Sequence, residues 1–389
     1  MKIAFFTEGY DPFVNGVVTS IKTLRSALER QGHEVVIFAP AHPGHEDNDE
    51  KVVRLPSLRW LKDHYPSLSP FARNLDVLAK QGFEIVHSHH PFTMGQLAVR
   101  LARKHGLPLI YTHHTMLNEY GQYVPLLDSA AKQWLIRRYL RHSADADRVT
   151  SATTVVRGFL RSQGVRAPVE VVLEGVPMMH PAAGGRERLR RQFGVSERTP
   201  VLLYAGRLAK EKRLDMLLRS VASLGRGRAF HLCVAGGGPM QEELRGLTDE
   251  LGIADRVSFC GWVEHEKLSD YYAAADVFVL PSPADAMGIV LVEAMSVGLP
   301  CVAVDKYGPS EVVIDGLTGF LTPFDERDFS EAVRRLLDNP SLRQRMAAAA
   351  RIRARDFDPD TTTARLVQVY QDVIAEREQL RSRPAWETA

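Results

Sequence analysis

The feature that most constrains this chain is a repeated alternation of short apolar segments with amphipathic helical segments. Residues 2–6 and 34–38 have the composition of buried strands, and apolar residues at helical spacing lie between them. The same pattern recurs at residues 84–112. Such βαβ units place parallel strands side by side in one sheet and cover the sheet with helices. The alternation therefore predicts an α/β fold.

The alternation is interrupted once, by a segment rich in Pro, Ala and Gly at residues 177–185. Beyond it, strand-like segments resume as PVLLYAG, FHLCVAGGG, RVSFCGW, DVFVLPS and PCVAV. A chain of 389 residues is long enough for two domains. We therefore predict two tandem doubly wound parallel sheets, with a domain boundary in the interrupting segment and a long last helix.

The composition is that of an ordinary globular protein, 45% hydrophobic with a formal net charge of +2, which does not indicate nucleic-acid binding. Cys233, Cys260 and Cys301 lie in strand-like segments, and their odd number makes no disulfide framework. The sequence contains neither a signal-peptide pattern nor an apolar segment long enough to span a bilayer. We therefore predict a cytoplasmic protein whose contact with a membrane is peripheral.

Polar residues follow several of the predicted strands, at the end where open α/β sheets bind ligands. AGRLAKEKRLD places Arg207, Lys210 and Lys212 between a strand and a helix. Such cations near a helix start suit a diphosphate, although a solvated charged loop has the same composition. The triplet Gly236 to Gly238 follows another strand and either admits a ligand to the backbone or forms an ordinary turn.

Two carboxylates, Asp285 and Glu293, flank a glycine and an apolar run in PSPADAMGIVLVEAM. With a helix beginning near Gly288, Asp285 lies in the preceding loop, and the first helical amides point to the ligand edge of the sheet. Carboxylates bind hydroxyl groups, so this arrangement suits a sugar attached to a phosphate. The alternative is a capping role for Asp285 and a buried structural role for Glu293, which would need a partner.

Two groups of histidines, HSHHP and THHT, end neighbouring predicted strands. His87, His89, His90, His113 and His114 would therefore converge at the ligand edge. Adjacent histidines point in different directions, so we expect hydrogen bonds to a polar ligand rather than a shared metal.

Together these motifs resemble the retaining glycosyltransferases of family 4, which have the GT-B fold, and the resemblance covers nearly the whole chain. The segment from Asp285 to Glu293 resembles the E-x7-E signature, with Asp in place of the first Glu. GRLAKEK is similar to the G-R-x(4)-K motif, FVNGVV to the glycine loop after the first strand, and YTHHT to the segment whose His faces the reacting centre. LEGVP departs from the family, because Glu174 stands where Asn or Thr is usual.

The resemblance implies two Rossmann-like domains facing a cleft. Residues 1–180 would bind the acceptor, residues 181–360 would bind the nucleotide sugar, and a C-terminal helix in 361–389 would return to the first domain. The implied reaction transfers a hexose, expected to be UDP-linked, from a nucleotide-diphosphate sugar to an acceptor hydroxyl with retained configuration. No metal or other cofactor is expected, because cations replace the divalent ion of other transferases.

The implied site residues are carried over by position. Those in catalysis are His114, Arg207, Lys212 and Asp285. Those that bind the donor are Gly16, Arg207, Lys212, Gly237, Asp285, Met287, Gly288, Ile289 and Glu293. Those expected on the acceptor side are His89, His90 and Tyr120.

VVTSIKTL, HSHHPFTMG and THHTMLNEYGQYVP resemble the enzymes that glycosylate diacylglycerol at the cytosolic membrane face. In AAKQWLIRRYLRH, apolar residues including Trp134 alternate with Arg137, Arg138 and Arg141, which is typical of a helix on an anionic membrane and equally of a core helix with surface cations. RLPSLRWLKDHYPSL, at 54–68, favours membrane contact. We therefore expect a lipid acceptor, with a soluble or phosphoinositide-type acceptor, a nucleotide-sugar epimerase and a non-catalytic sensor as alternatives.

Overall fold

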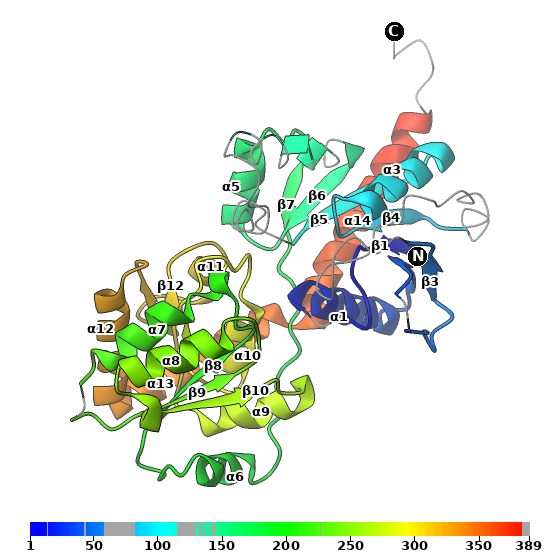
Figure 1. Cartoon of the computed structure of the whole chain (residues 1–389). Helices are drawn as coiled ribbons and strands as arrows, with labels where there is room; N and C mark the ends of the chain where they lie inside the picture. Colours follow the sequence, from blue (N-terminus) through cyan, green and yellow to red (C-terminus); the bar gives the residue numbers. More distant parts are fainter. Residues whose placement is uncertain are drawn as a thin grey trace. The chain divides into compact units, whose positions relative to one another are not determined.

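The computed structural model describes residues 1–13, 15–42, 44–57, 82–114, 130, 134, 137–138, 140–141, 145–225 and 227–382. The chain divides into two compact units, which are drawn in Figure 1. Unit 1 combines Met1–Gly175 with Pro359–Ala389, and unit 2 comprises Val176–Asp358. The chain thus leaves unit 1 and returns to it slightly earlier than the limits that we expected at 180 and 360.

Unit 1 contains a parallel sheet of seven strands within the described residues. In chain order these are β1 (Lys2–Phe6), β2 (Glu34–Pro40), β3 (Val52–Leu55), β4 (Ile85–Ser88), β5 (Leu109–His113), β6 (Arg148–Ser151) and β7 (Val169–Val171). Their spatial order is β3-β2-β1-β4-β5-β6-β7. The order changes direction between β1 and β4, which is where open α/β sheets bind ligands.

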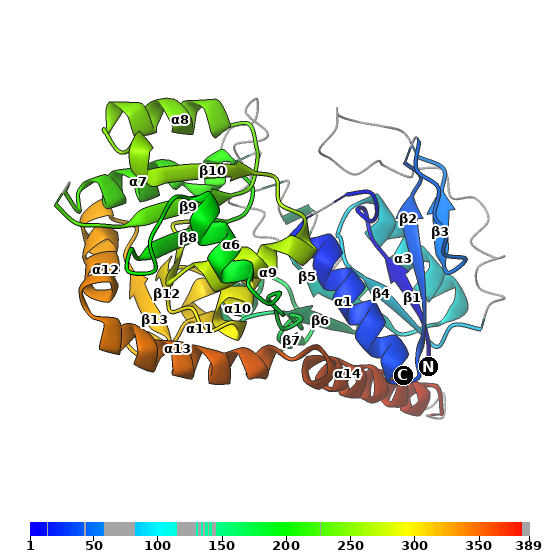
Figure 2. The same ribbon diagram turned by 90° about the horizontal axis from the view of Figure 1, so that it is seen from below.

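Helices α1 (Gly16–Arg30), α3 (Thr93–His105), α5 (Thr154–Ser162) and α14 (Pro359–Ser382) flank this sheet. α1 begins where the side chain of Asn15 accepts a hydrogen bond of 3.0 Å from the Val18 N–H. α14 lies beside α1 in Figure 2 and buries Val369 and Tyr370 in a cluster that includes Ile21. The last helix therefore completes the core of unit 1.

Unit 2 contains a parallel sheet of six strands in its described residues. In chain order these are β8 (Val201–Ala205), β9 (His231–Ala235), β10 (Val257–Gly261), β11 (Val277–Leu280), β12 (Cys301–Val304) and β13 (Gly319–Thr322). Their spatial order is β10-β9-β8-β11-β12-β13. The order changes direction between β8 and β11, so the loops that follow these two strands meet at the ligand edge of the sheet.

The following helices flank the sheet of unit 2, where η marks a 3₁₀ helix: α6 (Gly185–Gln192), η3 (Lys210–Lys212), α7 (Leu214–Ala222), α8 (Gln241–Glu250), η4 (Ala254–Arg256), α9 (His265–Ala274), α10 (Ile289–Ser296), α11 (Pro309–Val312), α12 (Glu326–Asp338), α13 (Pro340–Ala354) and η5 (Arg355–Phe357). Within the described part of the chain, no helix is both long and apolar enough to cross a bilayer.

The prediction of an α/β fold with two parallel sheets is confirmed. Each strand-like segment that the sequence pattern identifies forms a strand. The pattern does not identify β3, β6, β7 or β13, each of which has three or four residues and includes a charged or polar one.

Candidate active site

Two glycine-containing loops lie side by side at the ligand edge of unit 2. The first begins with Gly206, directly after β8, and the second is the triplet Gly236 to Gly238, directly after β9. Backbone hydrogen bonds join them, from Gly206 N to Ala235 O (3.0 Å) and from Leu208 N to Gly237 O (2.9 Å). The loop that carries the expected phosphate cations is therefore fixed against the glycine triplet.

The three glycines of the triplet differ in what their missing side chains allow. A Cβ atom at Gly236 would lie 1.8 Å from Gly206 O, and one at Gly238 would lie 2.3 Å from Leu208 O, so larger residues would separate the two loops. Among the described residues, a Cβ atom at Gly237 would approach nothing closer than Trp262 N, at 3.8 Å. Packing among the described residues therefore explains the glycines at 236 and 238 but not the glycine at 237.

Arg207 and Lys212, the expected diphosphate cations, each contact a carboxylate. Lys212 Nζ lies 2.6 Å from Asp285 Oδ1, and Arg207 Nη2 lies 2.5 Å from Glu211 Oε1. Glu211 is buried, whereas 41% of the Arg207 side chain is exposed. Both cations are therefore held by acids, and Arg207 still reaches solvent. Glu211 is not predicted from the sequence, although it follows Arg207 by four residues in the same loop.

Asp285 has one satisfied carboxylate oxygen and one unsatisfied oxygen. Its Oδ1 contacts Lys212, but its buried Oδ2 has no hydrogen-bond partner among the described residues. Because a buried oxygen without a partner is costly, an incoming hydroxyl group would find a ready acceptor in Oδ2.

The negative charge of Asp285 also acts on Tyr204. Burial, followed by the negative charges of Asp285 and Glu211, raises the pKa of Tyr204 well above its ordinary value, so this phenol stays neutral.

The loop between Asp285 and α10 is fixed through its backbone. Asp285 O accepts a hydrogen bond of 3.0 Å from Gly308 N, and a Cβ atom at Gly308 would lie 2.2 Å from Met287 Cα. Gly288 occupies the N-cap of α10 with a left-handed φ of 82°, and no side chain caps the helix. The alternative role of Asp285 as a helix cap is therefore wrong. The first amides of α10 have no acceptors within the helix.

Glu293 is buried inside α10 and has two partners from α9. Its Oε2 accepts a hydrogen bond of 2.7 Å from the Tyr272 hydroxyl, and its Oε1 lies 2.9 Å from His265 Nε2. The hydrogen bond to Glu293 raises the pKa of His265 despite partial burial. Each carboxylate oxygen can accept a further hydrogen bond. The sequence does not reveal these partners, because the contact depends on how α9 packs against α10.

Histidines of unit 1 separate into distinct hydrogen-bonded groups. His89 Nδ1 lies 3.0 Å from His114 Nε2, and His114 Nδ1 lies 2.9 Å from Glu174 Oε1. His87 instead contacts the hydroxyls of Thr112 and Tyr370, each at 2.6 Å. The structure therefore brings His89 and His114 together and adds Glu174.

His90 belongs to another group, since its Nδ1 lies 3.2 Å from Thr7 Oγ1 and accepts from Glu8 N at 3.2 Å. Among the described residues, no group of three or more His, Cys, Asp or Glu side chains is arranged so that it could hold a metal ion.

Burial keeps most of these histidines neutral. Desolvation, followed by the charge of His114, lowers the pKa of both His87 and His90 to about 3. Desolvation also lowers the pKa of His89 well below its ordinary value. Burial alone would raise the pKa of Glu174, but the charge and hydrogen bond of His114, with a hydrogen bond from Ser20, lower it overall. Glu174 is therefore ionised at neutral pH.

Glu8 is a buried carboxylate that sequence reasoning does not single out as a site residue. It accepts hydrogen bonds from Met94 N (2.7 Å) and Thr93 Oγ1 (3.0 Å) at the start of α3. Burial raises its pKa to about 7, although these hydrogen bonds act in the opposite direction. These contacts give Glu8 a structural role at the start of α3.

Comparisons with known proteins show the family of this chain. The family model described as Glycosyl transferases group 1 matches residues 185–353, and the model described as Glycosyltransferase Family 4 matches residues 14–178. The GDP-mannose-dependent alpha-mannosyltransferase of Mycobacterium tuberculosis is 30% identical over 90% of this chain and 91% of its own length. This chain belongs to glycosyltransferase family 4. The resemblance inferred from the sequence motifs is thereby confirmed.

Other relatives of this glycosyltransferase act on different acceptors, as their names state. The alpha-monoglucosyldiacylglycerol synthase of Streptococcus pneumoniae is 28% identical, over 88% of this chain and 80% of the relative. The D-inositol 3-phosphate glycosyltransferase of Streptomyces avermitilis is 32% identical, over 77% of this chain and 68% of the relative.

The crystal structure of HepE from Anabaena in complex with UDP has a TM-score of 0.76 to this chain, with 20% identity, and covers 96% of this chain and all of its own. The glycosyltransferase therefore has the GT-B fold.

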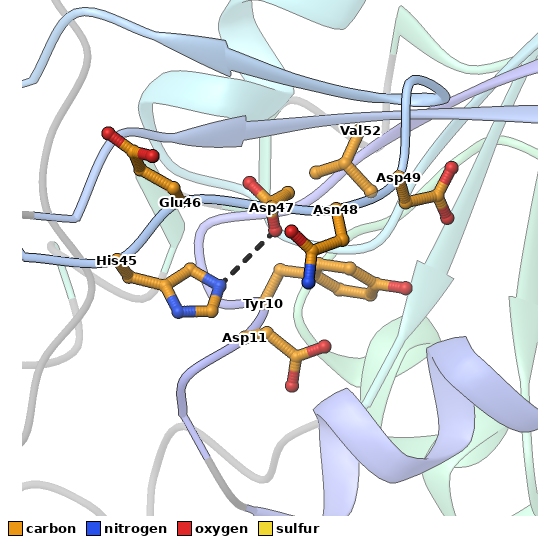
Figure 3. Close-up of a pocket in the computed structure, with 8 residues that line it drawn as sticks. All are labelled: Tyr10, Asp11, His45, Glu46, Asp47, Asn48, Asp49 and Val52. Atoms are coloured by element: carbon orange, nitrogen blue, oxygen red, sulfur yellow. Dashed lines mark hydrogen bonds and ion pairs between the residues drawn. The ribbon is translucent and has the colours of Figure 1, made fainter.

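A pocket of about 280 Å³ in unit 1 of the glycosyltransferase is shown in Figure 3. Its lining residues are Tyr10, Asp11, His45, Glu46, Asp47, Asn48, Asp49 and Val52. The carboxylates of Asp47 and Asp49 are already paired with Arg54 and Arg25, each at 2.6 Å. A phosphate would meet mainly negative charge here, so this pocket is not a candidate for the diphosphate of a donor.

The remaining residues expected at the membrane, in the donor site or on the acceptor side of the glycosyltransferase are described only in part. Trp134 is 61% exposed, and Arg137, Arg138 and Arg141 are exposed as well. Gly16 is the first residue of α1 and is exposed. Tyr120 lies outside the described residues, as does most of the segment 54–68.

Proposed function

We propose that this glycosyltransferase moves a hexose from a UDP-linked sugar to the hydroxyl group of diacylglycerol at the cytosolic face of a membrane, with retained anomeric configuration. The observation that carries the transfer step is the pair of Lys212 and Asp285, 2.6 Å apart at the ligand edge of unit 2. A sugar diphosphate has chemical groups that suit both the ammonium group of Lys212 and the carboxylate of Asp285. Its phosphate oxygens suit the ammonium group, and its hydroxyls suit the unsatisfied Asp285 Oδ2.

Arg207 and Lys212 would act on the leaving diphosphate. This group gains negative charge as its bond to the sugar breaks, so nearby cations stabilise the transition state more than the ground state. Gly237, and Gly16 at the start of α1, would let phosphate oxygens approach the backbone. These cations would take the place of a divalent ion, so we expect turnover that does not depend on metal.

The acids would orient the two ends of the donor. Asp285 Oδ2 would accept from hydroxyls of the sugar, while the backbone of Met287, Gly288 and Ile289 would contact the same sugar. Glu293 would accept from the ribose hydroxyls with its remaining acceptor capacity and share its Oε1 with His265. Support for UDP comes from the HepE complex, whereas the mycobacterial relative is named for GDP-mannose. Both bases therefore need to be tested.

The acceptor proposal rests on the pneumococcal relative, which is named for a glycosylated diacylglycerol, and on the exposed Trp134 with its neighbouring arginines. An exposed aromatic residue among cations suits the surface of an anionic bilayer. In unit 1, His89, His90 and His114 would contact the acceptor side of the reaction. The Streptomyces relative supports a second candidate acceptor, an inositol phosphate, which is water-soluble.

Product analysis tests this function directly. Purified protein is incubated with UDP- and GDP-linked hexoses, each without acceptor, with diacylglycerol in mixed micelles, and with inositol 3-phosphate. We expect nucleotide release and an α-linked glycolipid only with a UDP-hexose and diacylglycerol. Faster transfer to the inositol phosphate would refute the lipid acceptor, and an isomerised sugar without acceptor would indicate an epimerase. Adding a chelator to the productive mixture tests the expected independence from metal.

Membrane contact has its own test, the binding of the protein to liposomes with and without anionic lipid. We expect binding that salt weakens and that decreases in the triple variant Trp134→Ala, Arg137→Gln, Arg138→Gln. The matched control replaces Arg157 and Arg166, two exposed arginines elsewhere in unit 1, by Gln. Equal loss of binding in both variants would show that net charge, rather than this surface, attracts the protein.

A further inference from the structure

Glu174 is one of the residues, with Asp285, at which the motifs of this chain depart from the family pattern that they resemble, and the structure gives it a partner. Its Oε1 lies 2.9 Å from His114 Nδ1, and both side chains are largely buried, with 13% and 5% exposed. Glu174 follows β7 and immediately precedes Gly175, where the chain leaves unit 1. The departure from the family therefore coincides with a buried contact to the histidine expected at the reacting centre.

The hydrogen bonds around His114 define where its protons lie. A carboxylate can only accept, so the hydrogen between Glu174 and His114 belongs to Nδ1. His114 Nε2 faces His89 Nδ1 at 3.0 Å, and one proton is shared along that contact. His89 Nε2 is buried and has no partner among the described residues, so the chain of hydrogen bonds ends there. The only nitrogen of His114 that can exchange its partner is therefore Nε2.

We propose that Glu174 is a positioning residue for His114: its carboxylate fixes the imidazole with a proton on Nδ1, so that Nε2 is the nitrogen presented to a substrate hydroxyl. A carboxylate that orients a histidine in this way determines both the tautomer and the direction of the ring. The substrate part of this inference rests on the proposed glycosyl transfer. The tautomer part concerns unit 1 alone and can be measured without substrate.

The spectroscopic test uses full-length protein labelled with ¹⁵N-histidine. The His114 signals are assigned by comparison with His114→Gln. We expect wild-type His114 to show a protonated Nδ1. In Glu174→Gln, the amide can offer either its oxygen or its NH₂ group, so the two nitrogen signals should move toward values averaged between tautomers. Unchanged His114 signals in Glu174→Gln would overturn the proposal, whatever reaction the protein catalyses.

The kinetic test separates positioning from general damage. We expect Glu174→Gln to lower kcat about tenfold or more while the donor KM changes less than about twofold, because the proposed diphosphate contacts, apart from that of Gly16, lie in unit 2. Glu174→Asp, which keeps the charge on a shorter side chain, should recover part of kcat. Glu174→Asn introduces a residue usual in the family. Wild-type kcat in Glu174→Asn together with wild-type His114 signals would show that the carboxylate has no positioning role.

Glu170→Gln is the matched control, because it makes the same change four residues earlier. Glu170 lies on β7 and pairs with Arg148 and Arg365, at 3.5 and 3.2 Å, away from the histidines. We expect it to leave the His114 signals and kcat unchanged, and equal effects of the two substitutions would overturn the proposal. If wild-type protein transfers no sugar, the proposed function fails, and the ¹⁵N spectra alone decide the role of Glu174.

Discussion

At the residue scale, the acids at the two ends of the proposed donor site differ in how many of their carboxylate oxygens already have a hydrogen-bond partner. Within the part of the chain that the structure describes, Asp285 keeps one buried oxygen without a hydrogen-bond partner, whereas both oxygens of Glu293 already contact α9. A ligand hydroxyl at Asp285 would therefore donate to an oxygen that has no other donor among the described residues. A ligand hydroxyl at Glu293 would donate to an oxygen that already accepts a hydrogen bond. This difference leads us to expect that Lys212 and Asp285 matter most for turnover and that Glu293 matters for affinity.

Replacing Lys212 with Ala should lower kcat/KM by about two orders of magnitude, because the cation that would neutralise the leaving diphosphate is lost. The rate of nucleotide release with donor and acceptor measures the effect. Lys267→Ala is the control, since Lys267 is an exposed lysine of unit 2 paired with Glu264 at the start of α9. Wild-type turnover in Lys212→Ala would contradict the proposed site.

Replacing His265 with Gln should make stability less dependent on pH. The hydrogen bond to Glu293 raises the folded-state pKa of His265 above its ordinary value of 6.5. Its contribution to stability is therefore fully present below that value and is lost as pH rises through the folded-state pKa.

Urea unfolding at several pH values between 5 and 9 measures this effect. The difference in free energy of unfolding between wild type and His265→Gln should be larger at the acidic end and shrink toward the basic end. His180→Gln, at an exposed histidine of the same unit, should show no such trend. A difference that grows with pH would contradict the assigned direction.

The sequence predicts much of this candidate site but not the partners of its residues. Arg207, Lys212, Asp285 and Glu293 stand in local motifs, so the sequence singles them out as candidates and the family resemblance suggests their roles. Tyr272 and His265 meet Glu293 only because α9 packs on α10, and Glu174 meets His114 only because separate strands of one sheet end together. Such contacts depend on tertiary packing, which no local pattern records.

At the scale of secondary-structure elements, the apolar runs predict the central strands because buried parallel strands must be apolar on both faces. β6 reads RVTS and β7 reads VEV, so neither has a run long enough to distinguish it from a loop. α14 is predicted from its periodicity, whereas its return to the first domain is expected only from the family resemblance. It joins the core of unit 1 through Val369 and Tyr370.

Tyr370→Phe tests the attachment of α14. The Tyr370 hydroxyl lies 2.6 Å from His87 Nδ1, and both residues are fully buried. Removing this hydroxyl leaves a buried imidazole nitrogen without that partner, which should lower the free energy of unfolding by about 1–3 kcal/mol. Tyr271→Phe, at a partly buried position on α9, is the control. Denaturant unfolding of both variants measures the difference, and equal stability would show that the His87 contact contributes little.

At the scale of the whole molecule, the two units differ in continuity. Unit 2 is one segment, Val176–Asp358, whereas unit 1 needs two separate segments. The ends of unit 2 are adjacent, since Val176 N donates a hydrogen bond of 2.8 Å to Phe357 O. A continuous unit with adjacent ends and its own core satisfies the usual requirements for independent folding.

Residues 176–358 expressed alone should therefore unfold in one cooperative transition and bind the nucleotide of the donor, because the proposed diphosphate contacts are all in this unit except Gly16. Residues 1–175 alone should not unfold cooperatively, because they lack the core residues of α14. Circular dichroism during thermal unfolding, with calorimetric titration of UDP and GDP, measures both. Adding a peptide of residues 359–382 should restore structure to the first segment, and its failure to do so would contradict the role assigned to α14.

The discontinuity of unit 1 also determines the order of events on the ribosome. Ile3, Ile21 and Val35 leave the exit tunnel early, but the helix that completes their cluster is translated only after all of unit 2. At ordinary translation rates this delay is on the order of tens of seconds. Unit 2 can thus fold while the N-terminal segment of unit 1 still exposes apolar surface. We therefore expect chaperones to bind the nascent chain mainly at this N-terminal segment.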